Sequence, residues 1–227
     1  MNSGRVSHIK HAVAAHGYAF VPASVADAPP GDLVDDCSSF GTPQRLSGMT
    51  SVQVLRPRSE TDAPLNIYSG YFGYSKFPLH SDLAHWSDPP PYLVLRCIRG
   101  APNVFTRLVD SRLLIEAFGA MALRRTLVQP RKRVGRAKPL LPLLDVRSDR
   151  QFFRWDALFT NPATKASAHT FARIAAFLNN VPAGEVALAG TGDMLVIDNG
   201  RMLHGRSPVA DNATERCIER LYLAELL

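Results

Sequence analysis

Short apolar runs and runs of alternating apolar and polar residues recur along the chain and predict β-strands separated by turns. The clearest runs lie at residues 18–21, 51–56, 92–98, 104–109, 193–198 and 216–223. Only Gly100-Ala101-Pro102 joins the runs at 92–98 and 104–109, whereas successive strands of a parallel sheet need a helix between them. We therefore expect strands paired by short turns in an antiparallel β-core, with helices packed outside.

Helical patterns are few and predict elements that flank this core. They cover residues 5–16, ending at Gly17, a stretch that starts after Pro29-Pro30 and ends near Gly41, and residues 111–119 and 166–180. No pattern holds from Pro57 to Pro78, where glycines and tyrosines accumulate. Because structureless loops of this length inside a compact domain are usually functional, residues around 57–78 are predicted to form a mobile active-site loop.

Length and composition indicate one globular domain spanning residues 1–227. Hydrophobic residues make up 46% of the chain and charged residues 20%, which excludes a disordered protein. No apolar run approaches the ~20 residues that span a bilayer, and no basic-then-apolar leader precedes the first helical pattern. Three scattered cysteines are too few for a disulfide scaffold. We therefore expect a cytoplasmic protein with no membrane partner, and its oligomeric state stays open.

The formal net charge is +6, and much of the basicity lies in residues 124–138, where no acidic residue occurs. Nucleic-acid sites usually interleave such charges with stacking aromatic residues. This stretch has no aromatic residue, and Pro130 breaks any long basic helix. We therefore expect no nucleic-acid partner and interpret the stretch as a solvated loop or a lid for an anionic small molecule.

The most informative local string runs from Phe77 to Trp86 and contains His80, Asp82 and His85. Residues i and i+2 of an extended segment point to the same face. His80 and Asp82 therefore place an imidazole nitrogen beside a carboxylate oxygen, as two adjacent ligands of one metal require. A surface ion pair would produce the same pattern, so the pair alone does not decide between the two interpretations.

A second string, from Gly192 to Arg206, carries an apolar strand into a turn that delivers His204. Two histidines and one carboxylate, with the histidines far apart in sequence, match the facial triad of non-haem Fe(II) oxygenases. A structural zinc site would instead close four positions, usually with closely spaced cysteines. His80, Asp82 and His85 form an alternative ligand set without His204. We favour His204 and expect His85 to lie in the pocket or outside the ligand shell.

Two arginines follow this string in the chain. On a strand at 216–223, Arg216 and Arg220 share a face and lie about 13 Å apart. A buried arginine needs an anionic partner, and a carboxylate suits its planar guanidinium. Glu219 and neighbouring acids would satisfy both arginines on a surface. Because of the position of Arg216 shortly after His204, we favour a ligand carboxylate as its partner.

Together these strings resemble the taurine dioxygenase and clavaminate synthase superfamily of Fe(II)/2-oxoglutarate-dependent oxygenases. The resemblance runs in order through His80-Ser-Asp82, Pro90-Pro91-Tyr92, Thr106-Arg-Leu-Val-Asp110, Asp198-Asn199 and His204-Gly205-Arg206. The superfamily implies a mainly β fold with flanking helices, a distorted double-stranded β-helix (jelly roll). The chain departs from the family pattern in two places. It has Asn103-Val-Phe-Thr106 in place of the usual Gly-Gly-x-Thr, and Asp82 where clavaminate-like members often have Glu.

By position, the resemblance implies that His80, Asp82 and His204 bind iron and form the catalytic centre. Arg216 would hold the distal carboxylate of 2-oxoglutarate, and Thr106 would form a hydrogen bond to the same carboxylate. The implied cofactor is Fe(II), with 2-oxoglutarate and dioxygen as cosubstrates. The implied reaction is hydroxylation or desaturation of an unactivated carbon.

The resemblance also implies a small amino-acid-like or carboxylate-bearing substrate, because clavaminate-like members often act on amino acids. The residues expected to contact it lie around the motifs and are Asn66, Tyr68, His85, Arg154 and Arg220. Two alternatives stay open. One is an oxygenase that acts on a macromolecule, and the other is a catalytically inactive β-sandwich that binds a metal or a ligand.

Overall fold

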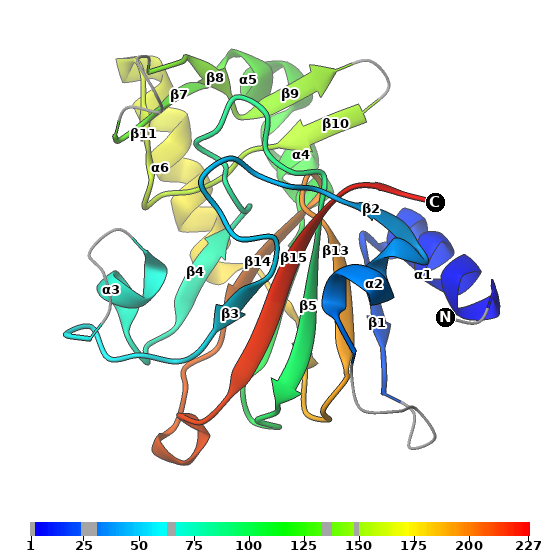
Figure 1. Ribbon diagram of the computed structural model, residues 1–227. Helices are drawn as coiled ribbons and strands as arrows, with labels where there is room; N and C mark the ends of the chain where they lie inside the picture. The colour runs from blue at the N-terminus through cyan, green and yellow to red at the C-terminus, as the bar shows by residue number, and fades with distance from the viewer. Residues whose placement is uncertain (1–2, 24–30, 63–66, 133–137, 148–149) are drawn as a thin grey trace.

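Two antiparallel sheets form the body of the protein in the computed structural model (Figure 1), which describes residues 3–23, 31–62, 67–132, 138–147 and 150–227. The larger sheet contains β1 (Tyr18–Val21), β13 (Met194–Asp198), β5 (Tyr92–Arg99), β15 (Cys217–Leu226) and β2 (Gly41–Pro43) in that order, with β3 (Gln53–Leu55) paired to β15. The smaller sheet contains, in order, β12 (Gly184–Ala187), β6 (Phe105–Asp110), β14 (Met202–Arg206) and β4 (Phe77–His80). The prediction of a mainly β fold with flanking helices is confirmed.

A hydrophobic core fills the space between the two sheets. Leu95 of β5 and Tyr222 of β15, from the larger sheet, meet Leu108 of β6 and Met202 of β14, from the smaller sheet, in one buried cluster. Because strand side chains alternate, the neighbours of these residues point to the outer faces. Each sheet thus has an inner face, and side chains from both inner faces can contribute to one site.

From β4 to β6, and again from β12 to β15, successive strands alternate between the two sheets. β5 pairs with β13 and β15 in the larger sheet, whereas β6 pairs with β12 and β14 in the smaller one. The prediction that the strands at 92–98 and 104–109 pair through their short turn is therefore wrong. The chain passes from the larger sheet to the smaller one at Gly100. Only glycine fits there, because a Cβ would collide with the carbonyl oxygen of Ala189.

Two helices near the N-terminus cover the outer face of the larger sheet (Figure 1). They are α1 (Ser3–His16), which confirms the helix predicted at 5–16, and the short α2 (Leu33–Ser38). Ile9 of α1 packs in a buried cluster with Val94 of β5 and Leu221 of β15. These helices therefore close the outer side of the sheet with apolar contacts and leave its inner side to the core.

The chain between β6 and β12 forms a separate layer of helices and short strands at one end of the sheets (Figure 1). Its elements are α4 (Arg112–Phe118), α5 (Ala120–Arg125), β7 (Leu127–Pro130), β8 (Leu141–Pro142), β9 (Leu144–Arg147), β10 (Arg150–Phe153), β11 (Thr160–Pro162) and α6 (Lys165–Asn180). The helices predicted at 111–119 and 166–180 correspond to α4 and α6. The short strands and α5 were not predicted, because runs of two to four residues carry little periodicity.

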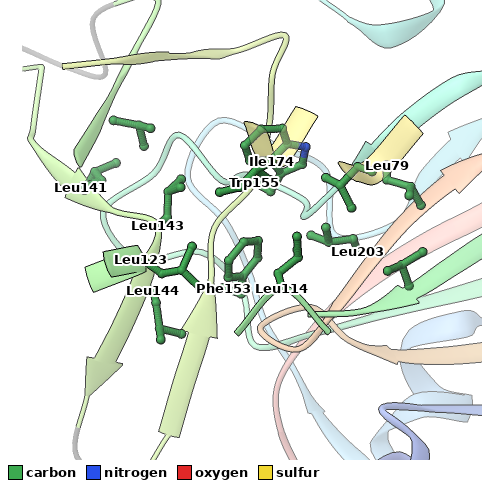
Figure 2. Packing of buried hydrophobic residues seen from close by; sticks show 13 residues of the cluster. Leu79, Leu114, Leu123, Leu141, Leu143, Leu144, Phe153, Trp155, Ile174 and Leu203 are labelled. Atoms are coloured by element: carbon green, nitrogen blue, oxygen red, sulfur yellow. The ribbon is translucent and has the colours of Figure 1, made fainter. Parts of the chain in front are cut away.

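A second hydrophobic core holds this layer together (Figure 2). Ile174 of α6 packs with Leu114 of α4 and Phe153 of β10, and the same cluster includes Leu79 of β4 and Leu203 of β14. The layer is therefore docked on the smaller sheet, directly behind the strands that carry the two predicted histidine ligands.

The segment predicted as a loop around 57–78 contains two regular elements. A short helix, α3, covers Tyr68–Phe72 and ends at Gly73, whose φ of 46° suits glycine, and β4 begins at Phe77. The loop prediction is wrong for these residues, because a five-residue helix is too short to show a helical period. Residues 63–66 lie outside the described part of the chain.

None of the helices in the described ranges is long and apolar enough to cross a membrane. The basic stretch at 124–138 begins at the end of α5 and continues through β7, and its residues 133–137 lie outside the described part of the chain. A short 3-10 turn, Asp211–Ala213, precedes β15 and completes the elements of the described chain.

Candidate metal centre

Three side chains converge on the inner face of the smaller sheet. His80 is the last residue of β4, His204 lies opposite it in β14, and Asp82 follows β4 by two residues. Asp82 Oδ1 is 3.5 Å from the Nε2 atoms of both histidines, and the possible ligand atoms of the three side chains lie within 4.8 Å of one another. All three side chains are buried, with exposed fractions of 6% or 7%. The structure brings the three predicted ligands together, and His85 is outside the group.

The two-residue period of a strand explains why both histidines point inward. Leu79 and Leu203, the residues just before His80 and His204, belong to the core of the docked layer (Figure 2). Their neighbours must therefore point to the opposite face of the sheet, toward the space between the sheets. The apolar leucines thus set the orientation of the two histidines of the candidate metal centre.

The surroundings of the two imidazoles fix the orientation of one and favour the neutral form of the other. His80 Nδ1 lies 2.9 Å from the carbonyl oxygen of Pro78 and donates a proton to it, which leaves Nε2 as the atom directed at the site. Burial lowers the pKa of His204, the nearby His80 lowers it further, and the neutral form is favoured. Burial also acts to lower the pKa of His80, but Asp82 and Asp156 outweigh burial and raise it. The two imidazoles and one carboxylate are a donor set that suits Fe(II).

The carboxylate of Asp82 is ionised despite its burial. Burial alone would raise its pKa, but Arg220 and the two histidines of the triad outweigh burial and hold that pKa well below its usual range. The backbone of Asp82 is also fixed, because its N–H donates to Asn199 Oδ1 at 2.7 Å and its carbonyl accepts from Asn199 Nδ2 at 3.0 Å. Asn199 belongs to the Asp198-Asn199 motif and positions the third ligand.

Arg216, which immediately precedes β15, is a buried cation without an anionic partner. Its side chain forms no ion pair with a described residue, and its Nε is buried with no hydrogen-bond partner in the described part of the chain. Burial lowers its pKa to about 10, and the pKa of Arg206 falls to about 10 through burial and the proximity of Arg216. Leaving a desolvated guanidinium unpaired is unfavourable, so the site is suited to an anionic ligand.

Thr106 lies on the same inner face of the smaller sheet. It is buried in β6, directly opposite Arg206 of β14 and two residues before Leu108, which belongs to the core between the sheets. Residues at i and i+2 of a strand share a face, so the Thr106 hydroxyl also points between the sheets. The position is consistent with the implied hydrogen bond to a carboxylate.

Two of the residues expected to contact substrate lie beside the triad. The ring of Tyr68, on α3, stacks on the ring of His80 with 4.1 Å between their centroids, and its hydroxyl donates to Asp156 Oδ1 at 3.0 Å. His85 has a half-buried side chain whose Nδ1 has no hydrogen-bond partner among the described residues. Burial lowers the pKa of His85, so it is neutral at pH 7. Asn66, also expected here, lies outside the described residues.

Arg154 is not placed to meet a substrate, which corrects the expectation from the sequence. Its side chain has no exposed surface, and its N–H groups donate to the carbonyl oxygens of Ala84, Trp86 and Pro142. An ion pair with Asp145 at 3.8 Å adds to these contacts. The guanidinium therefore holds the segment that follows Asp82 against the docked layer, which is a structural role.

Arg220 has protein partners on its guanidinium, unlike Arg216. Nη1 donates to Asp82 Oδ2 at 2.9 Å, while Nε and Nη2 donate to Gln53 Oε1 at 3.1 and 2.5 Å. The sequence predicted a substrate contact for Arg220, and the structure instead directs it to Asp82, a candidate metal ligand.

Asp156 is a site residue that the sequence analysis missed. Its carboxylate is buried, and Oδ1 accepts hydrogen bonds from Tyr68 Oη and from the backbone N–H groups of Leu158 and Phe159. Burial is the main cause that raises its pKa. An aspartate that follows an apolar run looks like the start of a surface turn, and no local signal distinguishes the two cases.

No family model matches the sequence, and no curated protein matches it. Solved structures do match. The non-heme iron oxygenase OrfP in complex with Fe and alpha-ketoglutaric acid has a TM-score of 0.74 and 20% identity, with 99% of this chain and 80% of that chain covered. Asparagine oxygenase (AsnO) has a TM-score of 0.70 and 18% identity, with 96% and 76% covered. PvcB from Pseudomonas aeruginosa has a TM-score of 0.68 and 18% identity, with 96% and 79% covered.

These similarities establish the class of fold: the chain has the double-stranded β-helix fold of non-haem iron oxygenases. The jelly roll expected from the motifs is thereby confirmed. At 18–20% identity the likeness concerns the fold, and the chemistry has to be argued from the residues at the site.

Proposed function

We propose that this protein is an Fe(II)/2-oxoglutarate-dependent oxygenase that hydroxylates, or desaturates, a small amino-acid-like or carboxylate-bearing molecule. The observation that carries the proposal is that two buried polar features lie near β14, which supplies His204 and also Arg206, whose pKa Arg216 lowers. One is the buried group of His80, Asp82 and His204, and the other is the buried guanidinium of Arg216, which has no partner among the described residues. The first is suited to a divalent metal and the second to an anion.

The donor set fits Fe(II). Two imidazoles and one carboxylate have their possible ligand atoms within 4.8 Å of one another, and these are the residue types of the 2-His-1-carboxylate triad. When bound with 2-oxoglutarate and dioxygen, the iron supplies the oxidation of an unactivated carbon, coupled to conversion of 2-oxoglutarate to succinate and carbon dioxide. The protein's own contribution is to orient the ligands and to keep the site buried.

The partner expected for Arg216 is the distal carboxylate of 2-oxoglutarate. A charge-assisted pair with a carboxylate would satisfy the guanidinium N–H groups that have no partner in the described chain. The buried hydroxyl of Thr106 is suited to donate to the same carboxylate. OrfP, a structure similar to this chain, was crystallised with Fe and alpha-ketoglutaric acid, which supports this assignment.

An amino-acid-like substrate is supported by the polar groups beside the triad. Asp156 is a buried carboxylate that no described Lys or Arg side chain pairs with, so it is suited to a substrate ammonium or guanidinium group. Tyr68 and His85 add an aromatic face and an imidazole near it. The similar structures include an asparagine oxygenase with 3-hydroxyasparagine and OrfP with (3S)-hydroxy-L-Arg, which agrees with this substrate class.

We also propose a cytoplasmic location and no nucleic-acid partner. All three cysteines, Cys37, Cys97 and Cys217, are free and buried, which supports a reducing compartment. The basic stretch has no aromatic residue of its own on which a base could stack, which supports a small-molecule substrate.

The decisive experiment adds Fe(II) and then 2-oxoglutarate to the protein without oxygen and records the weak visible charge-transfer band of the chelate. The unsubstituted protein is expected to show the band. His204→Ala is expected to lose it through loss of iron, and Arg216→Ala through loss of 2-oxoglutarate. The matched control is Arg99→Ala, an exposed arginine paired with Glu215, which should keep the band. Absence of the band in the unsubstituted protein, with iron bound, would overturn the proposal in favour of an inactive metal-binding β-sandwich.

A further inference from the structure

The two oxygens of Asp82 have different surroundings. Oδ1 faces the Nε2 atoms of His80 and His204, at 3.5 Å from each. Oδ2 accepts two hydrogen bonds, from Arg220 Nη1 at 2.9 Å and from Tyr222 Oη at 2.9 Å. One oxygen is therefore directed toward the other ligands, and the other oxygen is already occupied by protein donors.

Both donors come from one strand and are rigidly held. Arg220 and Tyr222 are two residues apart on β15, so their side chains share the inner face of the larger sheet. Gln53, on the neighbouring β3, accepts from two nitrogens of the Arg220 guanidinium. The Tyr222 ring is buried in the core between the sheets. Neither donor can follow the carboxylate if Asp82 rotates.

Rotation of Asp82 is unfavourable for a physical reason. Turning Oδ2 toward a metal would break both hydrogen bonds at once and leave a buried phenol and a partly buried guanidinium without that partner. A buried donor left without an acceptor is unfavourable, because it has lost its hydrogen bonds to water without replacing them. The carboxylate is therefore held in the orientation that offers a single oxygen.

We propose that Arg220 and Tyr222 are positioning residues that hold Asp82 as a one-oxygen metal ligand and so keep a coordination position free for the chelating cosubstrate. This inference rests on the proposed function, because it requires a metal at the triad. It assigns Arg220 to the metal ligand, and not to a substrate carboxylate. It also gives a role to Tyr222, which no motif singled out.

The test uses Co(II) in place of Fe(II) and two variants, Tyr222→Phe and Arg220→Gln. The visible d–d absorption of Co(II) weakens as its coordination number rises, so it reports whether Oδ2 has joined the metal. Both variants are expected to bind Co(II) with weaker d–d absorption than the unsubstituted protein. Their affinity for 2-oxoglutarate is expected to fall about 10-fold, the lower end of the loss of metal affinity or activity that follows removal of an outer partner of a metal ligand.

Two control variants separate positioning from a loss of stability. Arg99→Gln breaks an exposed ion pair with Glu215 of similar length, 3.0 Å, and Tyr18→Phe removes a tyrosine hydroxyl far from Asp82 in the sheet order. Each is expected to keep the absorption of the unsubstituted protein, whatever its effect on unfolding by urea. Tyr222→Phe removes only one oxygen atom, so it keeps the test valid if Arg220→Gln does not fold.

The outcomes distinguish this inference from the proposed function. If both variants bind Co(II) with the absorption and 2-oxoglutarate affinity of the unsubstituted protein, the positioning role is wrong and the metal site stands. If the unsubstituted protein binds no Co(II), the positioning role and the proposed function are both overturned. Altered absorption in the two site variants, with unchanged absorption in the two controls, supports the proposal.

Discussion

The buried arginines of this protein differ in whether they have partners, and the difference marks the site. Arg96 donates to the carboxylates of Asp36 and Glu219, and Arg154 donates to backbone carbonyl oxygens. Arg216 has neither kind of partner among the described residues. Its desolvated charge is balanced only when an anion binds, which is why an unpartnered charge in a folded protein is informative about function.

Replacement of Arg216 by Gln is expected to weaken 2-oxoglutarate binding without weakening metal binding. A hydrogen bond to a charged group contributes about 1.5–3 kcal/mol, which corresponds to an affinity loss of roughly 10- to 150-fold. Titration of the Mn(II)-loaded protein with 2-oxoglutarate measures this loss. Arg99→Gln, on the exposed Arg99–Glu215 pair, is the control. Equal affinities of Arg216→Gln and the unsubstituted protein would show that the anion site lies elsewhere.

The cysteines are expected to be unreactive in the folded protein. Burial raises the pKa of Cys37 to about 12 and that of Cys97 to about 11. At pH 8 the reactive thiolate is then roughly one part in 10,000 for Cys37 and one part in 1,000 for Cys97. Reactivity must rise as the pH approaches these values. Ellman's reagent at pH 8 should therefore modify these thiols only after unfolding in urea, and rapid modification of the native protein would contradict the burial.

At the scale of elements, the pairing of β4 with β14 builds most of the metal centre. His80 and His204 are register partners across these strands, and their leucine neighbours anchor the same strands to the docked layer. The distance between the two imidazoles is thus a property of the strand pair. A change that separates the strands must also separate the ligands.

Gly205→Ala is expected to impair both stability and metal binding. A Cβ at Gly205 would lie 2.7 Å from the Phe77 carbonyl oxygen, so β4 must move away from β14. Such overpacking costs about 1–3 kcal/mol. Urea unfolding and a Co(II) titration measure the two effects. Gly184→Ala is the matched control, because a Cβ there would meet only the Leu108 carbonyl oxygen, at 3.8 Å. Unimpaired metal binding in Gly205→Ala would show that the strand spacing does not control the site.

At the scale of the whole molecule, the candidate site joins the two sheets. The smaller sheet supplies His80 and His204, whereas β15 of the larger sheet supplies Arg220 and Tyr222 and follows directly after Arg216. Asp82 contacts groups from both sheets. A ligand in the site therefore links the two halves of the jelly roll, and its binding energy adds to the stability of the whole fold.

Metal binding is expected to stabilise the whole protein against unfolding. A ligand that binds only the native state at 100 times its Kd adds about 2.7 kcal/mol to the free energy of unfolding. Thermal unfolding with Mn(II), and then with excess EDTA, measures a rise in Tm and its reversal. His204→Ala should show no rise. A rise of equal size in His204→Ala would place the stabilising metal somewhere other than the triad.

The amino-acid sequence by itself was sufficient to predict the three candidate ligands, but not the strands β4 and β14 that carry the two histidines. The helices at 5–16 and 166–180 and the long core strands could be predicted, because amphipathic periods are local properties of ten or so residues. The His80-x-Asp82 spacing and the later His204 indicated the triad before any contact was known. The residue types and the hydrophobic period of short stretches were sufficient to predict these features.

Only the tertiary structure decided which strands pair and what each buried charge faces. β5 and β6 are adjacent in sequence yet lie in opposite sheets. Arg220 contacts Asp82, which lies 138 residues earlier in the sequence, and Asp156 contacts Tyr68, which lies 88 residues earlier. Such contacts depend on the packing of side chains over the whole core, and no window of the sequence contains both partners. The types of the candidate ligand residues can thus be read from short stretches of the sequence. The hydrogen bonds and charges that surround these residues form only when the two sheets pack against each other.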